Sequence, residues 1–376
     1  MKSRFAMLQG LFIFLLGVEI PFMTTQSTAG EKEATSGSLW VYIAGDGIHQ
    51  YLFDLDTGVM TPRSVTHDAQ PSFLAIHPNG RSLYGAGKEL SAFSIDQASG
   101  ALTLLNQIPY QKHGLCHLVV DATGGSVLSA GYGAGTVSVH QIGEDRKLGE
   151  HTALAQHEGS SLIVSRQQGP HAHSINLDPD NQFAFAADLG IDKIMVYRFN
   201  AAQGSLDSTE SSVALAPGAG PRHFTFHPQG RFAYVINELN STVVAYRYDG
   251  ASGQLTEIET ITTLPADFVG KNYPAEVVVD PSGRFLYGSN RGHDSIVVYA
   301  IDPDRGTLTW VQHVDTGGKW PRNFCIDPTG QYLLAANQQS DNVVVFRVEP
   351  STGELTANEH VIKVPSPSCI RFLQPQ

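Results

Sequence analysis

The chain alternates short apolar runs of β type with tight turns in a repeating order. A run such as Phe73-Leu-Ala-Ile is followed by a His/Asp-Pro-x-Gly turn and by a second run that ends in an aromatic residue or leucine. Proline presets φ and glycine accepts positive φ, so this pattern is typical of a tight turn between two strands. Six copies, some of them imperfect, begin at His77, Asp121, Asp178, His227, Asp280 and Asp327.

A second turn marker follows the first and joins two further β-type runs. Most copies resemble Gly306-Thr-Leu-Thr, and the third copy, Arg146-Lys-Leu148, lacks the glycine. Seven copies of this marker accompany six of the first. The strand missing from the first unit is supplied by residues 368–373, which read as an inner strand with no unit after it.

Seven units without amphipathic helical periodicity predict an all-β fold. We expect a seven-bladed β-propeller of four-stranded antiparallel blades in residues 39–373. Pairing of the C-terminal strand with the first blade closes the ring and removes free sheet edges. A solenoid of the same strands would need capping repeats, and the split first unit argues against it.

The first 29 residues have a different pattern. Lys2 and Arg4 precede an apolar run at 5–20, and small residues lead to Ala29. This order predicts a signal peptide over 1–29, with a flexible N-terminal segment over 30–38. A retained membrane anchor is the alternative, although the run is short for a bilayer. We therefore expect an exported protein (periplasmic or secreted), with no membrane association after leader removal; its oligomeric state stays open.

Charge and cysteine content limit the classes of binding partner that the chain could have. The net charge is −12 and no basic stripe is present, which argues against nucleic acid and anionic membranes. Cys116, Cys325 and Cys369 lie far apart in apolar surroundings, so they form no disulfide framework and no zinc pattern. We expect them to be buried small hydrophobic residues.

Strand order assigns the turns to two ends of the propeller. With antiparallel strands A to D in each blade, the A–B and C–D turns share one end, and the D–A and B–C loops share the other. The repeated turn markers occupy the first end, which we interpret as scaffold, together with His77 and His227. At the second end, blades one to three contribute little. Blades four to seven contribute His171, His173, Asp188, Arg222, His223, Asn237, Glu238, Glu276, Asn290, Arg291, His293, Arg322, Asn323 and Asn337.

Several of these groups have structural alternatives. Asp192, Asp294 and Asp341 recur at one place in their loops and are expected to cap turns, and the loop asparagines could do the same. His171 and His173 at strand spacing would point the same way, but no metal-ligand cluster accompanies them, so no metal site is predicted. The arginines could pair with the two glutamates; otherwise, charges near the axis are costly unless an anion binds.

The chain resembles the lactonase family of seven-bladed propellers, which includes propeller-type 6-phosphogluconolactonases and fungal carboxymuconate-lactonizing enzymes. The resemblance spans 39–373. It is most specific in Gly169-Pro-His171-Ala-His173, Ala187-Asp188-Leu-Gly-Ile-Asp192, Gly220-Pro-Arg222-His223, Asn237-Glu238-Leu, Tyr273-Pro-Ala-Glu276, Ser289-Asn-Arg291-Gly-His293-Asp-Ser and Trp320-Pro-Arg322-Asn323.

The muconate-lactonizing branch of the family implies a histidine, two arginines and a glutamate around the channel. The matching positions are His173 (or His171), Arg222, Glu238 and Arg291. One segment departs from the family. Residues 157–167 keep its His…Gly-Ser and Arg-Gln ends, but the middle is apolar where the resemblance leads us to expect Gly-Pro-Asn.

The leading hypothesis is hydrolysis of a sugar-acid lactone, most like 6-phosphogluconolactone, without cofactor or metal. Glu238 or His173 would activate water, and Arg222 and Arg291 would stabilise the oxyanion. The residues expected to bind a small anionic or sugar lactone are His171, Asp188, His223, Glu276, Asn290, His293, Arg322, Asn323 and Asn337. The export signal favours an unphosphorylated lactone, because sugar phosphates are cytosolic. The alternatives are a carboxymuconate-type cycloisomerase, a metal lactonase and a non-catalytic exported binding propeller.

Overall fold

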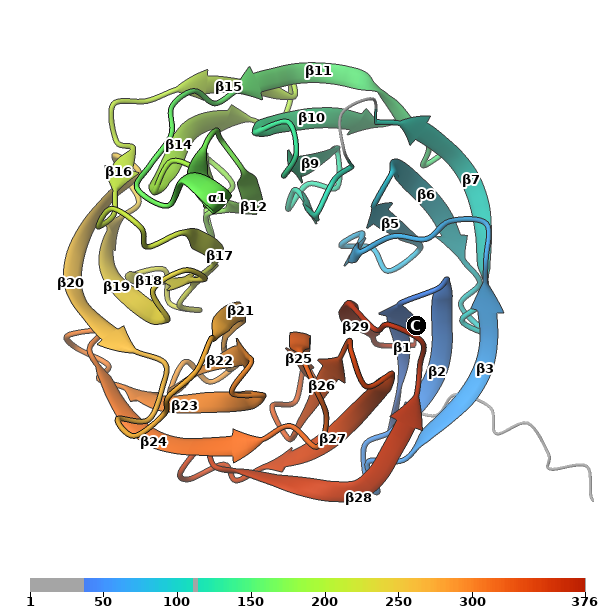
Figure 1. The fold of residues 1–376 in the computed structure, drawn as a ribbon. Coiled ribbons are helices and arrows are strands. Elements are labelled where there is room, and N and C mark those ends of the chain that lie inside the picture. Colours follow the sequence, from blue (N-terminus) through green and yellow to red (C-terminus); the bar gives the residue numbers. More distant parts are fainter. Residues whose placement is uncertain (1–36, 111–113, 376) are drawn as a thin grey trace, which may run out of the picture. The chain divides into compact units, whose positions relative to one another are not determined.

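The computed structural model describes residues 37–110 and 114–375, which form a ring of seven antiparallel sheets (Figure 1). The predicted seven-bladed β-propeller is confirmed. The predicted signal peptide and residues 30–36 lie outside the described residues. The first strand begins at Ser38, one residue before the predicted boundary.

Each blade runs from an inner strand at the channel to an outer strand. Blade 1 contains β29 (Cys369–Leu373), β1 (Ser38–Ala44), β2 (Ile48–Asp54) and β3 (Met60–Thr66). Blade 2 contains β4 (Phe73–Ile76), β5 (Ser82–Ala86), β6 (Glu89–Ile95) and β7 (Leu102–Pro109). Blade 3 contains β8 (His117–Val120), β9 (Ser126–Gly131), β10 (Thr136–Ile142) and β11 (Leu148–Gln156).

A single helical turn, α1 (Val164–Gln167), separates blades 3 and 4. Blade 4 contains β12 (Ala172–Leu177), β13 (Phe183–Asp188), β14 (Lys193–Asn200) and β15 (Ser205–Ser208), with an additional short β16 (Val213–Ala214) on β14. Blade 5 contains β17 (Pro221–Phe226), β18 (Phe232–Asn237), β19 (Thr242–Asp249) and β20 (Gln254–Thr262).

The last two blades complete the ring. Blade 6 contains β21 (Tyr273–Val279), β22 (Phe285–Arg291), β23 (Ser295–Ile301) and β24 (Leu308–Asp315). Blade 7 contains β25 (Pro321–Ile326), β26 (Tyr332–Asn337), β27 (Asn342–Val348) and β28 (Leu355–Lys363). Strand β29 pairs antiparallel with β1, from Ala44 opposite Cys369 to Trp40 opposite Leu373. This pairing confirms the predicted closure.

The A–B turns are held in the same way in successive blades. At Asp280, for example, the backbone N–H of Gly283 donates to the carbonyl of the turn's first residue at 2.9 Å, and Gly283 has a φ of 74°. The Nε2–H of His227 donates to the Gly283 carbonyl at 2.8 Å and so links the turns of blades 5 and 6. These repeated hydrogen bonds agree with the interpretation of this end as scaffold.

The C–D turns have positive φ and pack closely against the neighbouring blade, and glycine suits both conditions. A Cβ on Gly353 would lie 2.4 Å from Cδ1 of Phe285, and the Tyr287 hydroxyl donates to the Gly353 carbonyl at 2.9 Å. Arg146, which replaces the glycine in blade 3, also has a positive φ of 65°. The third marker therefore keeps the turn without its glycine.

Candidate functional site

The register of the inner strands places one residue of each blade at the same level of the channel. We call this set the inner ring, and it includes the blade 6 residue Glu276, which lies in a bulge. The other members pair with equivalent residues of the second strands. The inner ring consists of Cys369, Phe73, His117, Ser174, His223, Glu276 and Asn323.

Bulges set the direction of the residues just before the inner ring. The pairing of β17 with β18 shifts between Pro221 and His223, which leaves Arg222 as the extra residue. The same shift leaves His173 as the extra residue in β12 and Arg322 in β25. A bulge re-aims a side chain, so the fold repeats one device in three blades.

Three arginines surround one buried carboxylate at the mouth of the channel. Glu238 accepts from Nη2 of Arg166 at 2.5 Å through Oε1. Its Oε2 accepts from Nε of Arg222 at 3.1 Å and from Nη2 of Arg291 at 2.6 Å. Arg222 and Glu238 are only 1% and 4% exposed. Three of the four predicted catalytic residues are therefore in direct contact.

The charges of this cluster shape one another. Burial alone would raise the pKa of Glu238, but Arg291, Arg222 and Arg166 outweigh it and lower the pKa to about 2. Burial, reinforced by Arg291 and Arg322, lowers the pKa of Arg222 to about 9. Glu238 is thus ionised at neutral pH, and the groups around it are positively charged.

Arg322 adds a fourth guanidinium without a carboxylate partner. It is half-buried, lies close enough to depress the pKa of Arg222 and His173, and forms no ion pair or hydrogen bond with any described residue. Three guanidiniums therefore share the carboxylate of Glu238, and Arg322 adds a fourth positive charge near Arg222. This excess positive charge suits an anionic ligand.

A second acidic group lies in the inner ring. His223 Nδ1 donates to Oε1 of Glu276 at 2.8 Å, and Nδ2 of Asn323 donates to Oε2. Burial raises the pKa of Glu276, while Arg371 and Arg222 oppose this change. These predicted binding residues do meet, but within the channel rather than at its rim.

The two predicted histidines of blade 4 lie on either side of Tyr132. The His171 ring stacks on Tyr132 at 4.4 Å between centroids, and its Nδ1–H donates to the Tyr132 carbonyl at 2.9 Å. His173 meets Tyr132 and His223 edge-on at 5.4 and 5.3 Å. Burial, followed by Arg222 and His223, lowers the pKa of His173 well below its usual range. His173 is therefore neutral near pH 7.

Four residues expected to bind substrate form contacts with neighbouring loops and strands. Asp188 accepts from Nδ1 of His157 at 2.6 Å and from the backbone N–H of His171 at 2.7 Å. Asn290 and Asn337 donate to loop carbonyls at 2.8 and 2.9 Å. Nδ1 of His293 is hydrogen-bonded to Oγ of Ser295 at 2.6 Å, and its ring packs against Phe268 and His313.

The register relates these contacts to one another. Asp188, Asn237, Asn290 and Asn337 occupy one equivalent place, opposite the first residue of the third strand. The residue after them points the other way. In blades 5 and 6 this next residue is Glu238 or Arg291. Asp188, Asn290, His293 and Asn337 thus have partners within the protein, and their expected role in substrate binding stays a prediction.

Several site residues were not expected. Arg166 belongs to α1 and extends from it to Glu238. Asp192 holds this segment in place: its Oδ1 accepts from Gln167 at 2.7 Å and its Oδ2 accepts from Ser161 at 2.5 Å. Asp192 also accepts from the backbone N–H groups of Gly218 and Gly220, both at 2.6 Å. The Arg-Gln end of segment 157–167 was the available signal. The apolar middle does not prevent Arg166 from reaching Glu238.

Blades 1 and 3 also contribute more than predicted. Blade 3 supplies Tyr132, Cys116 and His117, and blade 1 supplies Arg371, whose guanidinium lies 4.6 Å from the centroid of Phe73. Cys116 Sγ lies 3.9 Å from Nδ1 of His173. His117 is an inner-ring residue and Cys116 precedes it, so strand register could have located these two.

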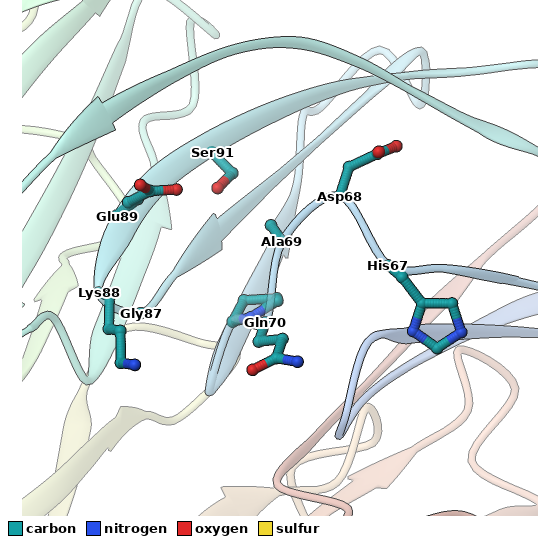
Figure 2. A pocket seen from close by; sticks show the side chains of 9 residues that line it. His67, Asp68, Ala69, Gln70, Gly87, Lys88, Glu89 and Ser91 are labelled. Atoms are coloured by element: carbon teal, nitrogen blue, oxygen red, sulfur yellow. The ribbon is translucent and has the colours of Figure 1, made fainter.

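Other possible sites are limited within the described parts of the chain. No group of three or more His, Cys, Asp or Glu side chains there is arranged to hold a metal ion. No helix among the placed residues has the length and hydrophobicity needed to cross a bilayer. A separate cavity of about 270 Å³ lies at the loops of blades 1 and 2, lined by residues such as His67, Asp68 and Lys88 (Figure 2). None of the arginine-cluster residues lines it.

Comparison with known proteins agrees with this architecture. The family model for lactonases of the seven-bladed β-propeller type matches residues 37–372. The 6-phosphogluconolactonase of Bacillus subtilis is 37% identical over 291 residues, covering 75% of this chain and 82% of that protein. The 6-phosphogluconolactonase of Formosa agariphila is 34% identical over 287 residues, covering 73% and 80%.

A solved structure extends the similarity to three dimensions. The periplasmic gluconolactonase of Pseudomonas aeruginosa is 30% identical, with a TM-score of 0.85 over 90% of this chain and 100% of that one. Sequence and fold therefore point to the same group of proteins.

Proposed function

Because the chain belongs to the lactonase family of seven-bladed β-propellers, we propose that it hydrolyses the lactone of a sugar acid. The observation that carries this proposal is the cluster of three guanidiniums around the Glu238 carboxylate, with Arg322 nearby and free of any ion pair among the described residues. Lactone hydrolysis develops negative charge on the carbonyl oxygen, and buried fixed cations stabilise that charge more strongly than water does. A purely structural cluster would have no use for the unpaired Arg322.

The arginines divide into two roles. Arg222 and Arg291 are held by Glu238 and by backbone carbonyls, at 2.6 Å from Arg222 to Ala275 and 2.8 Å from Arg291 to Tyr273. This fixed geometry suits stabilisation of the tetrahedral oxyanion. Arg322 is left for an anionic end of the substrate, since a guanidinium fork fits carboxylate or phosphate.

Glu238 is poorly suited to be the base. Its pKa of about 2 makes it a weak proton acceptor, and both oxygens accept hydrogen bonds from guanidiniums. We assign it to positioning the arginines. An imidazole of the channel is then the remaining kind of base.

Metal independence and export belong to the same proposal. A divalent cation at the mouth would be repelled by the four guanidiniums, so the site is expected to work without one. The signal-like sequence at 1–29 and the periplasmic neighbour both favour an exported enzyme. An exported enzyme would meet unphosphorylated aldonolactones rather than sugar phosphates.

The test is a panel of lactones with and without phosphate, together with a muconate, assayed by acid release or cyclisation and corrected for spontaneous reaction. We expect opening of an aldonolactone, and Arg322→Gln should raise KM for anionic members of the panel. Arg198→Gln, on the exposed face of β14, is the matched control and should change nothing. A protein that opens no lactone above the spontaneous rate is not a lactonase, and cyclisation of the muconate would establish the cycloisomerase alternative.

A further inference from the structure

We infer that His223, oriented by Glu276, is the base that takes the proton from the attacking water. This inference rests on the proposed lactone hydrolysis and adds the proton acceptor that Glu238 cannot be. It concerns a hydrogen-bonded chain across blades 1, 7, 6 and 5, lying one residue deeper in the channel than the bulged arginines.

The chain fixes the direction of every donor. The backbone N–H of Ile370 donates to Oδ1 of Asn323 at 2.8 Å, so the amide nitrogen of Asn323 faces Glu276. That nitrogen donates to one carboxylate oxygen, and Nδ1 of His223 lies 2.8 Å from the other. Because Glu276 accepts both hydrogen bonds, His223 carries its proton on Nδ1 and its lone pair on Nε2.

The nitrogen that carries the lone pair, Nε2, is not used in any hydrogen bond among the described residues. Nε2 of His223 is buried and has no hydrogen-bond partner among the described residues, and the residue is 3% exposed. A buried acceptor without a partner costs free energy. A water or substrate hydroxyl that donates to Nε2 would remove this cost.

The two neighbouring histidines lack these features. Nδ1 of His173 lies 3.9 Å from the Cys116 thiol and has no carboxylate partner among the described residues. Nδ1 of His117 accepts from the backbone N–H of Ile175 at 3.3 Å. Of the three imidazoles, His223 alone has a carboxylate to orient it and to stabilise the imidazolium that forms during the reaction.

The surroundings keep His223 unprotonated in the resting protein. Its ring is packed by Phe73, His117 and His173 at centroid distances of 5.7, 5.1 and 5.3 Å. Burial, then Arg222, Arg322, Arg291 and Arg371, lower its pKa well below 6.5. His223 is therefore neutral at pH 7. These cations oppose protonation, which makes the charge of Glu276 necessary for the step.

The step balances as follows. Water attacks the lactone carbonyl carbon as its proton passes to Nε2 of His223, and the carbonyl electron pair becomes the oxyanion beside Arg222 and Arg291. The intermediate then collapses, the ring C–O bond breaks, and the departing alkoxide takes the proton back from the imidazolium. The products are the hydroxy acid and unprotonated His223.

The first experiment is independent of catalysis. Nitrogen NMR of histidine-labelled protein should show His223 as the Nδ1–H tautomer near pH 7, assigned by loss of its signals in His223→Asn. In Glu276→Gln the amide nitrogen offers a donor where the carboxylate accepted, so we expect a change of tautomer or ring position. An Nε2–H tautomer in the wild type overturns the inference, whether or not the protein is a lactonase.

The second experiment uses the lactone that the wild type opens. His223→Asn and Glu276→Gln should each lower kcat/KM by about 10²–10⁴-fold and abolish the acidic limb of the pH profile, which lies well below pH 6.5 in the wild type. His313→Asn, on the outer strand β24, should keep both activity and pH profile. Denaturation curves check that each variant is folded.

The outcomes separate the two proposals. A wild type that opens no lactone removes the proposed function, and the tautomer result then stands alone. An active wild type whose His223→Asn variant keeps the acidic limb, while His173→Asn loses it, assigns the base to His173 and overturns the inference. If only one of His223→Asn and Glu276→Gln folds, that variant decides the kinetic result.

Discussion

Replacing Glu238 by glutamine tests whether this carboxylate neutralises the arginine cluster. The substitution keeps the size of the side chain and removes the charge on which three guanidiniums converge. Glutamine can still accept through its oxygen, but its NH₂ group faces a guanidinium donor. We therefore expect a loss of stability and a site that is more positive by one charge.

The size of the loss follows from the pKa of Glu238. The arginines overcome the effect of burial and move the pKa from 4.5 to about 2. Each pKa unit corresponds to about 1.4 kcal/mol, so ionised Glu238 stabilises the fold by about 3 kcal/mol near pH 7. Breaking a buried ion pair by removing one partner typically costs about 3–5 kcal/mol. The two figures agree in magnitude.

The assay is urea denaturation of both proteins over a range of pH. Because the folded-state pKa is depressed, the stabilisation is complete above about pH 4.5 and is lost as the pH falls toward 2. The difference between wild type and Glu238→Gln should therefore be constant near neutrality and shrink in acid. Glu150→Gln, on the exposed face of β11, is the control. Equal stability of wild type and Glu238→Gln at pH 7 would refute this reasoning.

Four further outcomes are expected. Arg222→Lys should lose about 10²–10³-fold in turnover and remain folded; near-full turnover would make Arg222 scaffold. Exhaustive EDTA treatment should leave lactone opening undiminished, and loss of activity restored by calcium or zinc would contradict the arginine-centred mechanism. Gly353→Ala should lower the unfolding midpoint in urea more than Gly230→Ala, because a Cβ at Gly353 would lie 2.4 Å from Phe285, whereas a Cβ at Gly230 would lie 3.5 Å from its nearest neighbour. The two glycines have similar φ values of 76° and 70°, so equal effects would show that the clash with Phe285 does not contribute. The three buried neutral histidines of the channel should make the free energy of unfolding fall below pH 6.5, by about 1.4 kcal/mol per pH unit for each in urea titrations, partly offset by Glu276; a flat profile would contradict their neutrality.

The architecture was predictable because the turns between strands have recognisable local sequences. The His/Asp-Pro-x-Gly and Gly-x-Leu-Thr markers give the number and order of strands, and antiparallel alternation assigns them to two ends. Even Arg146, the exception, follows the rule in the structure, since its backbone adopts the glycine conformation. These features are local, so tertiary contacts did not need to be known.

The orientation of side chains at the mouth was harder to predict. Asn290 and Arg291 are neighbours at the end of β22, yet the first donates to the Thr263 carbonyl and the second reaches Glu238. The bulges that decide such orientations arise from pairing between strands. Arg166 depends on α1 and on Asp192, which join segments far apart in sequence. Such residues could not be placed from spacing alone.

The closure of the ring has a kinetic consequence. Ala44 and Cys369 are paired although more than 300 residues separate them. Bringing such distant segments together costs roughly 5 kcal/mol of chain entropy, and contacts of long sequence separation slow folding. Until β29 docks, blade 1 is a three-stranded sheet with an open inner edge. Once docked, neither β1 nor β29 can leave without breaking the pairing that holds both. We therefore expect slow unfolding and resistance to proteolysis to depend on these five residue pairs more than on any comparable contact within a single blade.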